Sequence, residues 1–262
     1  MRRKLDGLRM LITGASSGIG RALALLAALE GVRLLLTARR EERLEGLVAE
    51  IEARGGQACY VAGDIADPAL RQQLVEKAQA ELGGLDVLVN NAGIGAYGPF
   101  ETASAERLRK IMEVNFFAPV ELMRLCLPLL EQGTSPAVCN ISSVLAHRAV
   151  PGKSEYCASK FALHGFSDAV RAEWSKKGID VILVSPSTTS SEFSAAVIEN
   201  RGQNAAIGAL ARTPEAVAKA TLAAIRAGKH EIIPSHPGRM LVLLDRLSPS
   251  VADWALARFS RF

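Results

Sequence analysis

Short apolar segments alternate along almost the whole chain with longer segments that carry the hydrophobic spacing of amphipathic helices. The apolar segments, which we predict to be strands, cover residues 9–13, 32–37, 57–61, 85–89, 137–141, 179–184 and 231–233. The helical segments cover residues 18–30, 41–54, 68–82, 104–131 (with a break at Pro119), 154–177 and 214–227. Continuous apolar runs are typical of strands buried on both faces of a parallel sheet. The alternation therefore predicts an α/β fold: a single doubly wound Rossmann-type domain with a mainly parallel seven-stranded sheet and helices on both faces.

Composition excludes several classes of protein. Of the 262 residues, 49% are hydrophobic and 22% are charged, which is too apolar for an intrinsically disordered chain. The longest unbroken apolar run is residues 22–29, far short of the roughly 20 residues of a spanning helix. A net charge of +4 without a basic stripe predicts no nucleic-acid partner. Four scattered cysteines predict reduced thiols, a cytoplasmic location and no metal site.

The chain shows no internal linker, so residues 1–235 are predicted to form one domain, followed by a helical tail over residues 236–262. The tail is apolar and contains Arg239, Arg246, Arg258 and Arg261. Two interpretations remain open: the tail packs on the domain or on a partner subunit, or it lies peripherally on a membrane surface. The four histidines share no spacing, and we assign them no metal or catalytic role.

A glycine-rich loop joins the first predicted strand to the first predicted helix. Glycines let the backbone turn sharply and approach a ligand, and the free N–H groups of a helix N-terminus bind phosphate. The alternative is a tight strand–helix turn without a ligand. We interpret the loop as a dinucleotide site whose candidate residues are Gly14, Ser16, Ser17, Gly18, Ile19 and Gly20.

The end of the second predicted strand indicates which nicotinamide cofactor fits. NAD-binding loops place an acidic residue there to hold the ribose 2′-hydroxyl, but this chain has Ala38 followed by Arg39 and Arg40. A guanidinium pairs well with a 2′-phosphate. The sequence therefore predicts NADP(H), with Arg39 as the preferred ligand, whereas Arg40 is equally well explained as a solvent-facing residue at the start of the next helix.

Three motifs in this order resemble the short-chain dehydrogenase/reductase family: the glycine loop, Asn90-Asn91-Ala92-Gly93, and Tyr156-Cys157-Ala158-Ser159-Lys160. The resemblance covers roughly residues 5–235. Tyr156 and Lys160 are four residues apart on a predicted helix, so they share one face. A nearby cation favours the phenolate, so Lys160 is expected to lower the pKa of Tyr156, which then serves as acid and base at a substrate carbonyl or alcohol.

The resemblance implies roles for further residues. Ser143 would bind the substrate carbonyl oxygen, with its neighbour Ser142 as the less favoured alternative, and Asn115 would support a proton relay to Lys160. Asp64 would contact the adenine, whereas Asp67 is better explained as a helix cap. The remaining expected cofactor contacts are Ile65, Asn91, Ala92, Gly93, Pro186, Thr189 and Ser191. Ser187 departs from the family pattern, which has glycine there, and this puts the geometry at the nicotinamide end in doubt.

The segment from residue 190 to 212 is expected to cover the substrate. Tyr97, Leu145 and Phe193 are the predicted lining residues, and their character favours an uncharged, lipophilic ketone or alcohol. The resemblance also implies a homodimer or homotetramer, paired through the helices at 105–131 and 154–177. Two alternative functions are a dinucleotide-binding sensor or scaffold with little turnover, and an epimerase acting on nucleotide sugars, for which the tail is too short.

Overall fold

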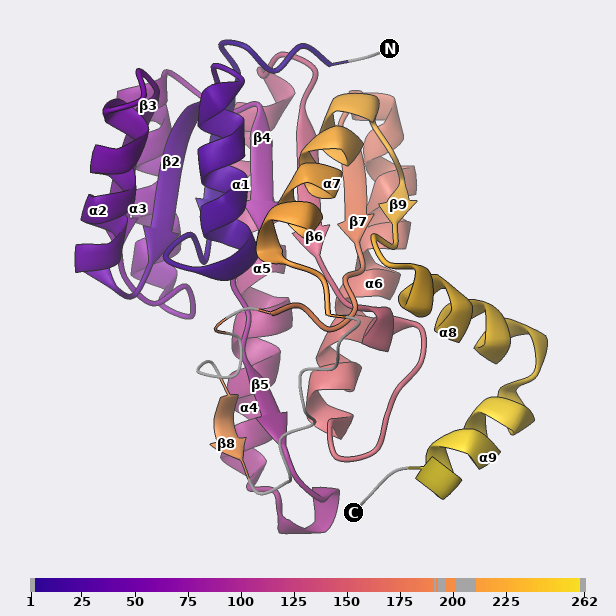
Figure 1. Ribbon diagram of the computed structural model, residues 1–262. Coiled ribbons are helices and arrows are strands. Elements are labelled where there is room, and N and C mark those ends of the chain that lie inside the picture. Colours follow the sequence, from indigo (N-terminus) through magenta and orange to yellow (C-terminus); the bar gives the residue numbers. More distant parts are fainter. Residues whose placement is uncertain (1–2, 191, 193–196, 201–210, 260–262) are drawn as a thin grey trace.

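The computed structural model describes residues 3–190, 192, 197–200 and 211–259 (Figure 1). Its centre is a seven-stranded sheet with the order β3-β2-β1-β4-β6-β7-β9, in which each pair of neighbours is parallel. The strands are β1 (Arg9–Thr13), β2 (Arg33–Ala38), β3 (Gln57–Ala62), β4 (Val87–Asn90), β6 (Ala137–Ile141), β7 (Asp180–Val184) and β9 (Glu231–Ile232). The predicted fold class is confirmed, and every predicted strand is present within two residues of its expected ends.

Helices cover both faces of this sheet. One face carries α1 (Gly18–Leu29), α2 (Glu41–Glu52) and α7 (Pro214–Ala227), and the other carries α3 (Pro68–Lys77), α4 (Ala105–Met112), α5 (Ala118–Glu131) and α6 (Ser154–Trp174). Successive strand residues belong to opposite cores, since Met10 and Ile12 face one layer and Leu11 the other. This is why the strands are apolar at every position rather than at alternate ones.

The predicted break at Pro119 is wrong. The helical path continues from α4 into α5, and its irregularity is a π-helical turn, η3 (Glu113–Phe117), just before the proline. Pro119 lies in the first turn of α5, where a missing N–H costs little. A second π-helical turn, η1 (Ala78–Leu82), extends α3, and a 3-10 turn, η5 (Ser175–Lys177), extends α6.

Several short elements escaped the sequence analysis. A separate parallel pair joins β5 (Gly95–Tyr97) to β8 (Val197–Asn200). Two 3-10 turns are η2 (Phe100–Thr102) and η4 (Val144–Ala146). The sequence analysis had no strand at either position: it gave residues 95–97 no element and expected residues 190–212 to cover the substrate.

The tail forms two helices, α8 (His236–Leu247) and α9 (Pro249–Phe259), that extend away from the sheet (Figure 1). Val242 and Ala252 are buried, and Arg148 from the loop after β6 forms ion pairs with Asp245 and Asp253. These residues therefore hold the inner side of the tail against the loop after β6. Within the described ranges, no helix has both the length and the apolar character needed to cross a bilayer.

A buried ion pair fixes the start of α6. Arg107 on α4 donates from Nε to Glu155 Oε1 at 2.9 Å, and both side chains are almost completely shielded from solvent. Burial opposes ionisation of Glu155, but the hydrogen bond and charge of Arg107, together with hydrogen bonds from the backbone and from Ser154, hold the pKa of this carboxyl below its ordinary value. Since Glu155 directly precedes Tyr156, the pair holds the first turn of α6 in place.

Candidate active site

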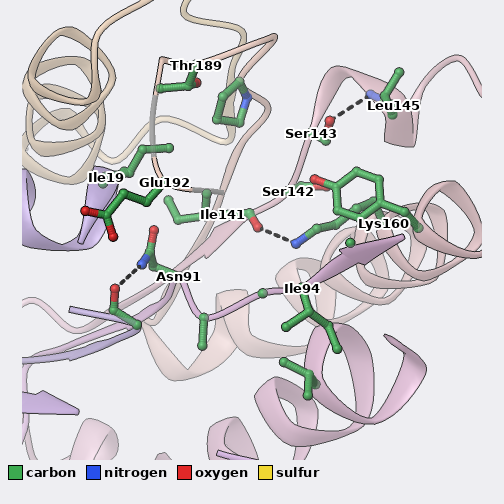
Figure 2. Close-up of a pocket in the computed structure, with 18 of the residues that line it drawn as sticks. Ile19, Asn91, Ile94, Ile141, Ser142, Ser143, Leu145, Lys160, Thr189 and Glu192 are labelled. Carbon is green, nitrogen blue, oxygen red and sulfur yellow. Dashed lines mark hydrogen bonds between the residues drawn. The ribbon is translucent and has the colours of Figure 1, made fainter. Parts of the chain in front are cut away.

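A pocket of about 900 Å³ opens at the carboxyl ends of β1, β4, β6 and β7 (Figure 2). Ligands of doubly wound folds bind at this edge of the sheet. The predicted site residues that line it are Gly14, Ser16, Ser17, Gly18, Ile19, Arg39, Asp64, Ile65, Asn91, Ala92, Gly93, Tyr97, Ser143, Leu145, Tyr156, Lys160, Pro186 and Thr189. Gly20 and Asn115 are not among the lining residues, and Ser191 and Phe193 lie outside the described residues.

The glycine loop is held tightly against the end of β4. Asn91 donates from its side-chain amide to the carbonyl oxygens of Thr13 (2.9 Å) and Gly14 (3.1 Å). A Cβ on Gly14 would lie 2.9 Å from the Ala92 Cα, and the Gly14 φ of +67° itself favours glycine. A Cβ on Gly20 would lie 2.5 Å from Asn91 Nδ2. The expected ligand contact of Gly20 is therefore corrected: this glycine permits close packing behind the loop.

The two arginines after β2 have different surroundings. Arg39 is an exposed residue at the pocket wall. Arg40 donates from Nη2 to Ser16 Oγ at 3.0 Å and to Ser17 Oγ at 2.8 Å, and its Nη1 lies 3.0 Å from Glu192. Arg40 is exposed at the start of α2, as expected, and in addition it bonds the wall formed by the glycine loop. The sequence analysis also did not identify Glu192 as a pocket residue, because Glu192 and its partner Arg40 are far apart in the sequence.

The polar groups at the end of β6 surround the first turns of α6. Lys160 donates from Nζ to the Ile141 carbonyl at 3.0 Å, and this ammonium lies 5.7 Å from the centre of the Tyr156 ring. Burial lowers the pKa of Lys160 to about 8. Burial also raises the pKa of Tyr156, while a hydrogen bond with Ser143 acts in the opposite direction. The three predicted catalytic groups, Ser143, Tyr156 and Lys160, are thus brought together.

A chain of buried amides and hydroxyls sets the position of α6 relative to the sheet. Asn90 at the end of β4 donates to Asn140 Oδ1 on β6 at 2.9 Å, and Asn140 donates to Ser167 Oγ on α6 at 2.9 Å. Buried polar groups linked in this way allow few alternative arrangements. The network therefore supports the register that places Tyr156 and Lys160 at the pocket.

Asn115 lies behind the pocket wall, in the π-helical turn η3. Its side chain accepts from the Ile94 N–H (2.9 Å) and donates to the Ile94 carbonyl (3.0 Å) and to Ser159 Oγ (2.9 Å). Gly93 lies between this amide and the lysine: a Cβ on Gly93 would be 3.3 Å from Asn115 Oδ1 and 3.7 Å from Lys160 Nζ. The π-helical turn thus carries a polar side chain to the back of the catalytic group.

The structure also shows the surroundings of the predicted residues Asp64, Asp67, Ser187 and Thr189. Asp64 Oδ1 accepts from the Ala66 N–H at 3.0 Å while lining the pocket, and Asp67 caps α3 as expected. Ser187 does not take a positive φ, so its side chain causes no backbone strain. Thr189 donates to the Ser187 carbonyl at 3.1 Å.

The pocket is also lined by Tyr97 and Leu145, together with residues that the sequence analysis did not identify. These are Ile94, Ala96, Lys110, Val114, Val144, Val150 and Lys153, with Pro237, Gly238 and Leu241 from the tail. Lys153 Nζ lies 4.7 Å from the centre of the Tyr97 ring, which gives its charge a favourable cation–π contact. The tail therefore forms part of the pocket wall, although it follows the last strand of the sheet.

The family model of the short chain dehydrogenases matches residues 9–202. The chain belongs to the short-chain dehydrogenase/reductase family. A short chain dehydrogenase of Pseudocercospora fijiensis is 39% identical over 194 residues, which cover 73% of this chain and 63% of that protein. Dehydrogenase/reductase SDR family member 7B of Bos taurus is 32% identical, over 96% of this chain and 81% of its own length.

Two solved structures of the family are similar to this short-chain dehydrogenase/reductase. A family member from Burkholderia phymatum in complex with NAD matches with a TM-score of 0.85 and 25% identity, over 95% of this chain and 96% of that chain. A short chain dehydrogenase from Burkholderia cenocepacia in complex with NADP matches with a TM-score of 0.79 and 28% identity, over 88% of this chain and 97% of that chain.

The burial of Lys160 predicts a measurable cost in stability. Its pKa falls from an ordinary 10.5 to about 8, so below pH 8 the folded state bears the full cost of the buried charge. Lys160→Met should raise the free energy of unfolding at pH 7 by about 1–3 kcal/mol. The difference in stability between Lys160→Met and the wild type should narrow as pH rises from 8 to 10.5. In that range the unfolded wild type binds more protons than the folded wild type, so the wild type gains stability as pH rises.

Urea denaturation of both proteins at pH 7 and pH 10 measures this gap. Lys4 is exposed, so Lys4→Met serves as the matched control and should leave stability nearly unchanged. A Lys160→Met protein that is less stable than wild type at pH 7, or a gap independent of pH, contradicts the assigned burial cost.

Proposed function

We propose that this short-chain dehydrogenase/reductase is an NADP(H)-dependent oxidoreductase that interconverts a carbonyl and a secondary alcohol on an uncharged, lipophilic substrate. The observation that carries the proposal is the convergence of Ser143, Tyr156 and Lys160 at one pocket that also contains the glycine loop. A cytoplasmic location is part of the proposal, and the free thiols at Cys59, Cys126, Cys139 and Cys157 support it.

The pocket suits a dinucleotide. The loop at Gly14 approaches the end of β4 too closely for a side chain, and its backbone lies at the N-terminus of α1. Thr37 Oγ1 and Ser142 Oγ are buried pocket groups without a hydrogen-bond partner within the described part of the chain. A polar ligand would supply partners for them.

The chain's own residues would handle the proton and the substrate oxygen. When bound, the nicotinamide supplies or accepts a hydride. In reduction Tyr156 donates its phenolic proton to the carbonyl oxygen, and in oxidation the phenolate accepts the alcohol proton. Burial raises the pKa of Tyr156, opposite in direction to the lowering expected from Lys160, so the phenol is protonated at neutral pH and giving up its proton requires stabilisation of the phenolate. Ser143 donates a hydrogen bond to the same substrate oxygen.

Lys160 and Asn115 would act behind Tyr156. The charged ammonium of Lys160 favours the phenolate that forms when Tyr156 gives up its proton. Asn115 keeps Ile94 and Ser159 in place and directs its oxygen toward the space left open at Gly93, next to Lys160 Nζ. We assign to this space the proton relay that restores Tyr156.

Arg39 is our preferred ligand for the 2′-phosphate of NADP(H). Ala38 puts no carboxylate beside the pocket at the end of β2, and Arg39 stands exposed at the pocket wall. Arg40 already bonds Ser16 and Ser17, so it acts on the loop that binds the shared pyrophosphate. The family member from Burkholderia cenocepacia in complex with NADP supports this preference, while the one from Burkholderia phymatum in complex with NAD marks the alternative.

A panel of neutral ketones and aldehydes, each paired with a carboxylate-bearing analogue, tests the function with NADPH and with NADH. We expect NADPH oxidation with neutral substrates. Arg39→Ala should reduce the preference for NADPH over NADH about 10- to 100-fold, since hydrogen bonds to charged groups contribute about 1.5–3 kcal/mol. Arg40→Ala should weaken the binding of NADPH and of NADH by the same factor.

Arg43 is the matched control, because it pairs with Glu192 but does not line the pocket. Equal use of NADPH and NADH by the wild type contradicts the role of Arg39. Tight NADPH binding without oxidation by any carbonyl favours the alternative function, a dinucleotide-binding sensor or scaffold with little turnover. A preference for the carboxylate analogues contradicts the uncharged substrate.

The outer face of the tail supports a peripheral membrane contact. Its exposed large apolar side chains are Met240, Leu243, Leu244, Leu247, Val251 and Trp254. Arg246 and Arg258 are also exposed, and basic residues beside an apolar face are typical of helices that lie on anionic lipid. Leu241 of the same helix lines the pocket, so a lipophilic substrate would reach the pocket directly from the bilayer surface.

Co-sedimentation with anionic vesicles tests the lipid contact. The double variant Leu247→Glu/Trp254→Glu should bind at least about tenfold more weakly, because it removes two apolar side chains from the contact. Leu29→Glu is the matched control, since Leu29 is 63% exposed on α1, as Trp254 is on α9. The contact is contradicted if the wild type and the double variant sediment equally with the vesicles, or if the wild type does not sediment with them.

A homodimer or homotetramer is also part of the proposal. Leu108 on α4, Phe117 in η3 and Phe161 on α6 are large apolar side chains exposed to solvent. They lie on the helices at 105–131 and 154–177, through which two subunits are expected to pair by resemblance to the family. A partner subunit that covered them would remove this apolar surface from water.

A further inference from the structure

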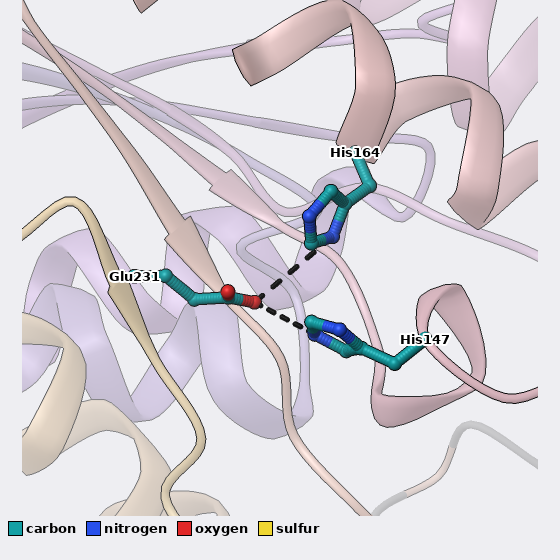
Figure 3. A group of neighbouring side chains, drawn as sticks. All are labelled: His147, His164 and Glu231. Carbon is teal, nitrogen blue, oxygen red and sulfur yellow. Dashed lines mark hydrogen bonds and ion pairs between the residues drawn. The ribbon is translucent and has the colours of Figure 1, made fainter. Parts of the chain in front are cut away.

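Three side chains that do not line the pocket lie close together: His147, His164 and Glu231 (Figure 3). His147 follows the 3-10 turn η4, His164 lies on α6, and Glu231 begins β9. His147 Nε2 lies 2.8 Å and His164 Nδ1 lies 4.0 Å from the same oxygen, Glu231 Oε1. One potential ligand atom of each residue lies within 4.8 Å of the other two.

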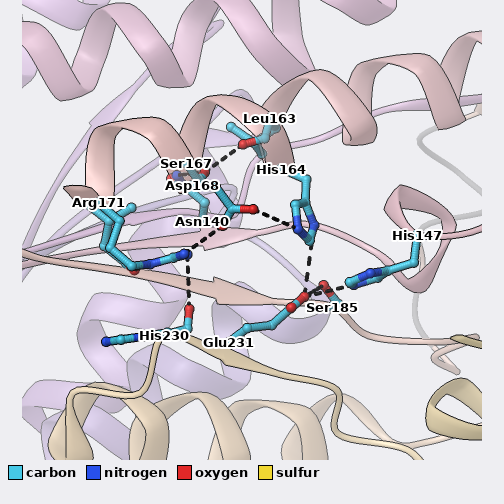
Figure 4. A network of polar contacts seen from close by, with 11 residues as sticks. Asn140, His147, Leu163, His164, Ser167, Asp168, Arg171, Ser185, His230 and Glu231 are labelled. Atoms are coloured by element: carbon cyan, nitrogen blue, oxygen red, sulfur yellow. Dashed lines mark hydrogen bonds and ion pairs between the residues drawn. The ribbon is translucent and has the colours of Figure 1, made fainter. Parts of the chain in front are cut away.

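One nitrogen of this cluster lacks a hydrogen-bond partner. His164 Nδ1 is buried and makes no hydrogen bond within the described part of the chain. The other nitrogen of the same ring, Nε2, lies 3.4 Å from Asp168 Oδ2 (Figure 4). A buried ring nitrogen without a partner is unusual and indicates an absent binding partner.

We propose that His147 Nε2, His164 Nδ1 and Glu231 Oε1 bind one divalent transition-metal ion, for which Zn²⁺ is the best match. Two imidazoles and one carboxylate are an established set of zinc ligands, and they leave a fourth position for water. Bonds of about 2.0–2.1 Å in a tetrahedron put ligand atoms about 3.3 Å apart. The two nitrogen–oxygen distances, 2.8 and 4.0 Å, lie on either side of that value, and all three atoms lie within 4.8 Å of one another, so the side chains would have to move closer together to complete the site.

Neighbouring groups already orient the proposed ligands. Asp168 lies against the far nitrogen of His164, which is the carboxylate–histidine arrangement common around zinc. Ser185 donates from Oγ to Glu231 Oε1 at 2.8 Å. The His147 ring nitrogen Nε2 lies 2.8 Å from the same oxygen, so Glu231 Oε1 is held in place from two sides.

The site would connect three elements that shape the active site. Ser143 caps the turn η4 that His147 follows, and His164 lies one helical turn beyond Lys160 on α6. Glu231 belongs to the strand that leads into α8, whose first turn lines the pocket. A bound ion would tie these elements together outside the pocket and would stabilise the position of Ser143. No chemical step is assigned to the metal.

The full chain, without an affinity tag and after treatment with chelator, is titrated with Zn²⁺ by calorimetry and with Co²⁺ by visible absorption. We expect one equivalent to bind and Co²⁺ to give the absorption of a tetrahedral site. Asp168→Asn changes a residue that orients a ligand without binding the metal, so it should weaken Zn²⁺ binding by roughly 10- to 100-fold. His164→Gln removes a ligand itself, so it should weaken Zn²⁺ binding by more than Asp168→Asn does.

His236→Gln is the matched control, because His236 is exposed and lies outside the cluster. It should bind Zn²⁺ like the wild type. Glu231→Gln provides a second ligand variant in case His164→Gln does not fold, as judged by circular dichroism. Millimolar or weaker binding by the wild type, or equal affinity in the ligand variants and His236→Gln, would show that the cluster is only an ion pair and would overturn the proposal.

Discussion

The close approach of the loop after β1 to the end of β4 is the constraint on which the rest of the site depends. Asn91 spans this contact by bonding two carbonyls of the loop, and Thr13 Oγ1 accepts from the N–H groups of Asn91 and Ala92. Only glycine fits at positions 14 and 20 in this arrangement. The contact therefore fixes the N-terminus of α1 beside the point where the strand order reverses, where ligands of this fold class bind.

The pocket wall at Tyr156 and Lys160 depends on a second constraint, the burial of polar groups away from solvent. Lys160 is almost fully buried, and its ammonium donates a hydrogen bond to the Ile141 carbonyl. The π-helical turn at Asn115 and the open space at Gly93 extend this polar region away from the substrate. Burial of the Lys160 ammonium is the unfavourable contribution among these features, and such local costs are common at functional sites.

The fold could be predicted well from the sequence because strands buried on both faces appear as continuous apolar segments. The glycine loop and the Asn90–Gly93 motif come at the ends of such strands. Tyr156 and Lys160 share a helix, so their neighbourhood follows from local geometry alone. The role of Arg40 was not predictable in this way, since its partners Ser16 and Glu192 are far away in the chain. The meeting of His147, His164 and Glu231 depends on three separate elements, and histidine spacing contains no sign of it. Pro119 misled because a proline in a first turn does not break a helix.

The central claim, that Tyr156 is the proton donor at the substrate oxygen, is tested most directly by comparing two phenols of the same pocket. With NADPH and a neutral ketone, Tyr156→Phe should lower kcat by about 10²- to 10⁴-fold, while the Kd for NADPH changes little. Tyr97→Phe, which removes the other phenolic hydroxyl, should retain most of the activity. A Tyr156→Phe enzyme that turns over at the wild-type rate would contradict the account.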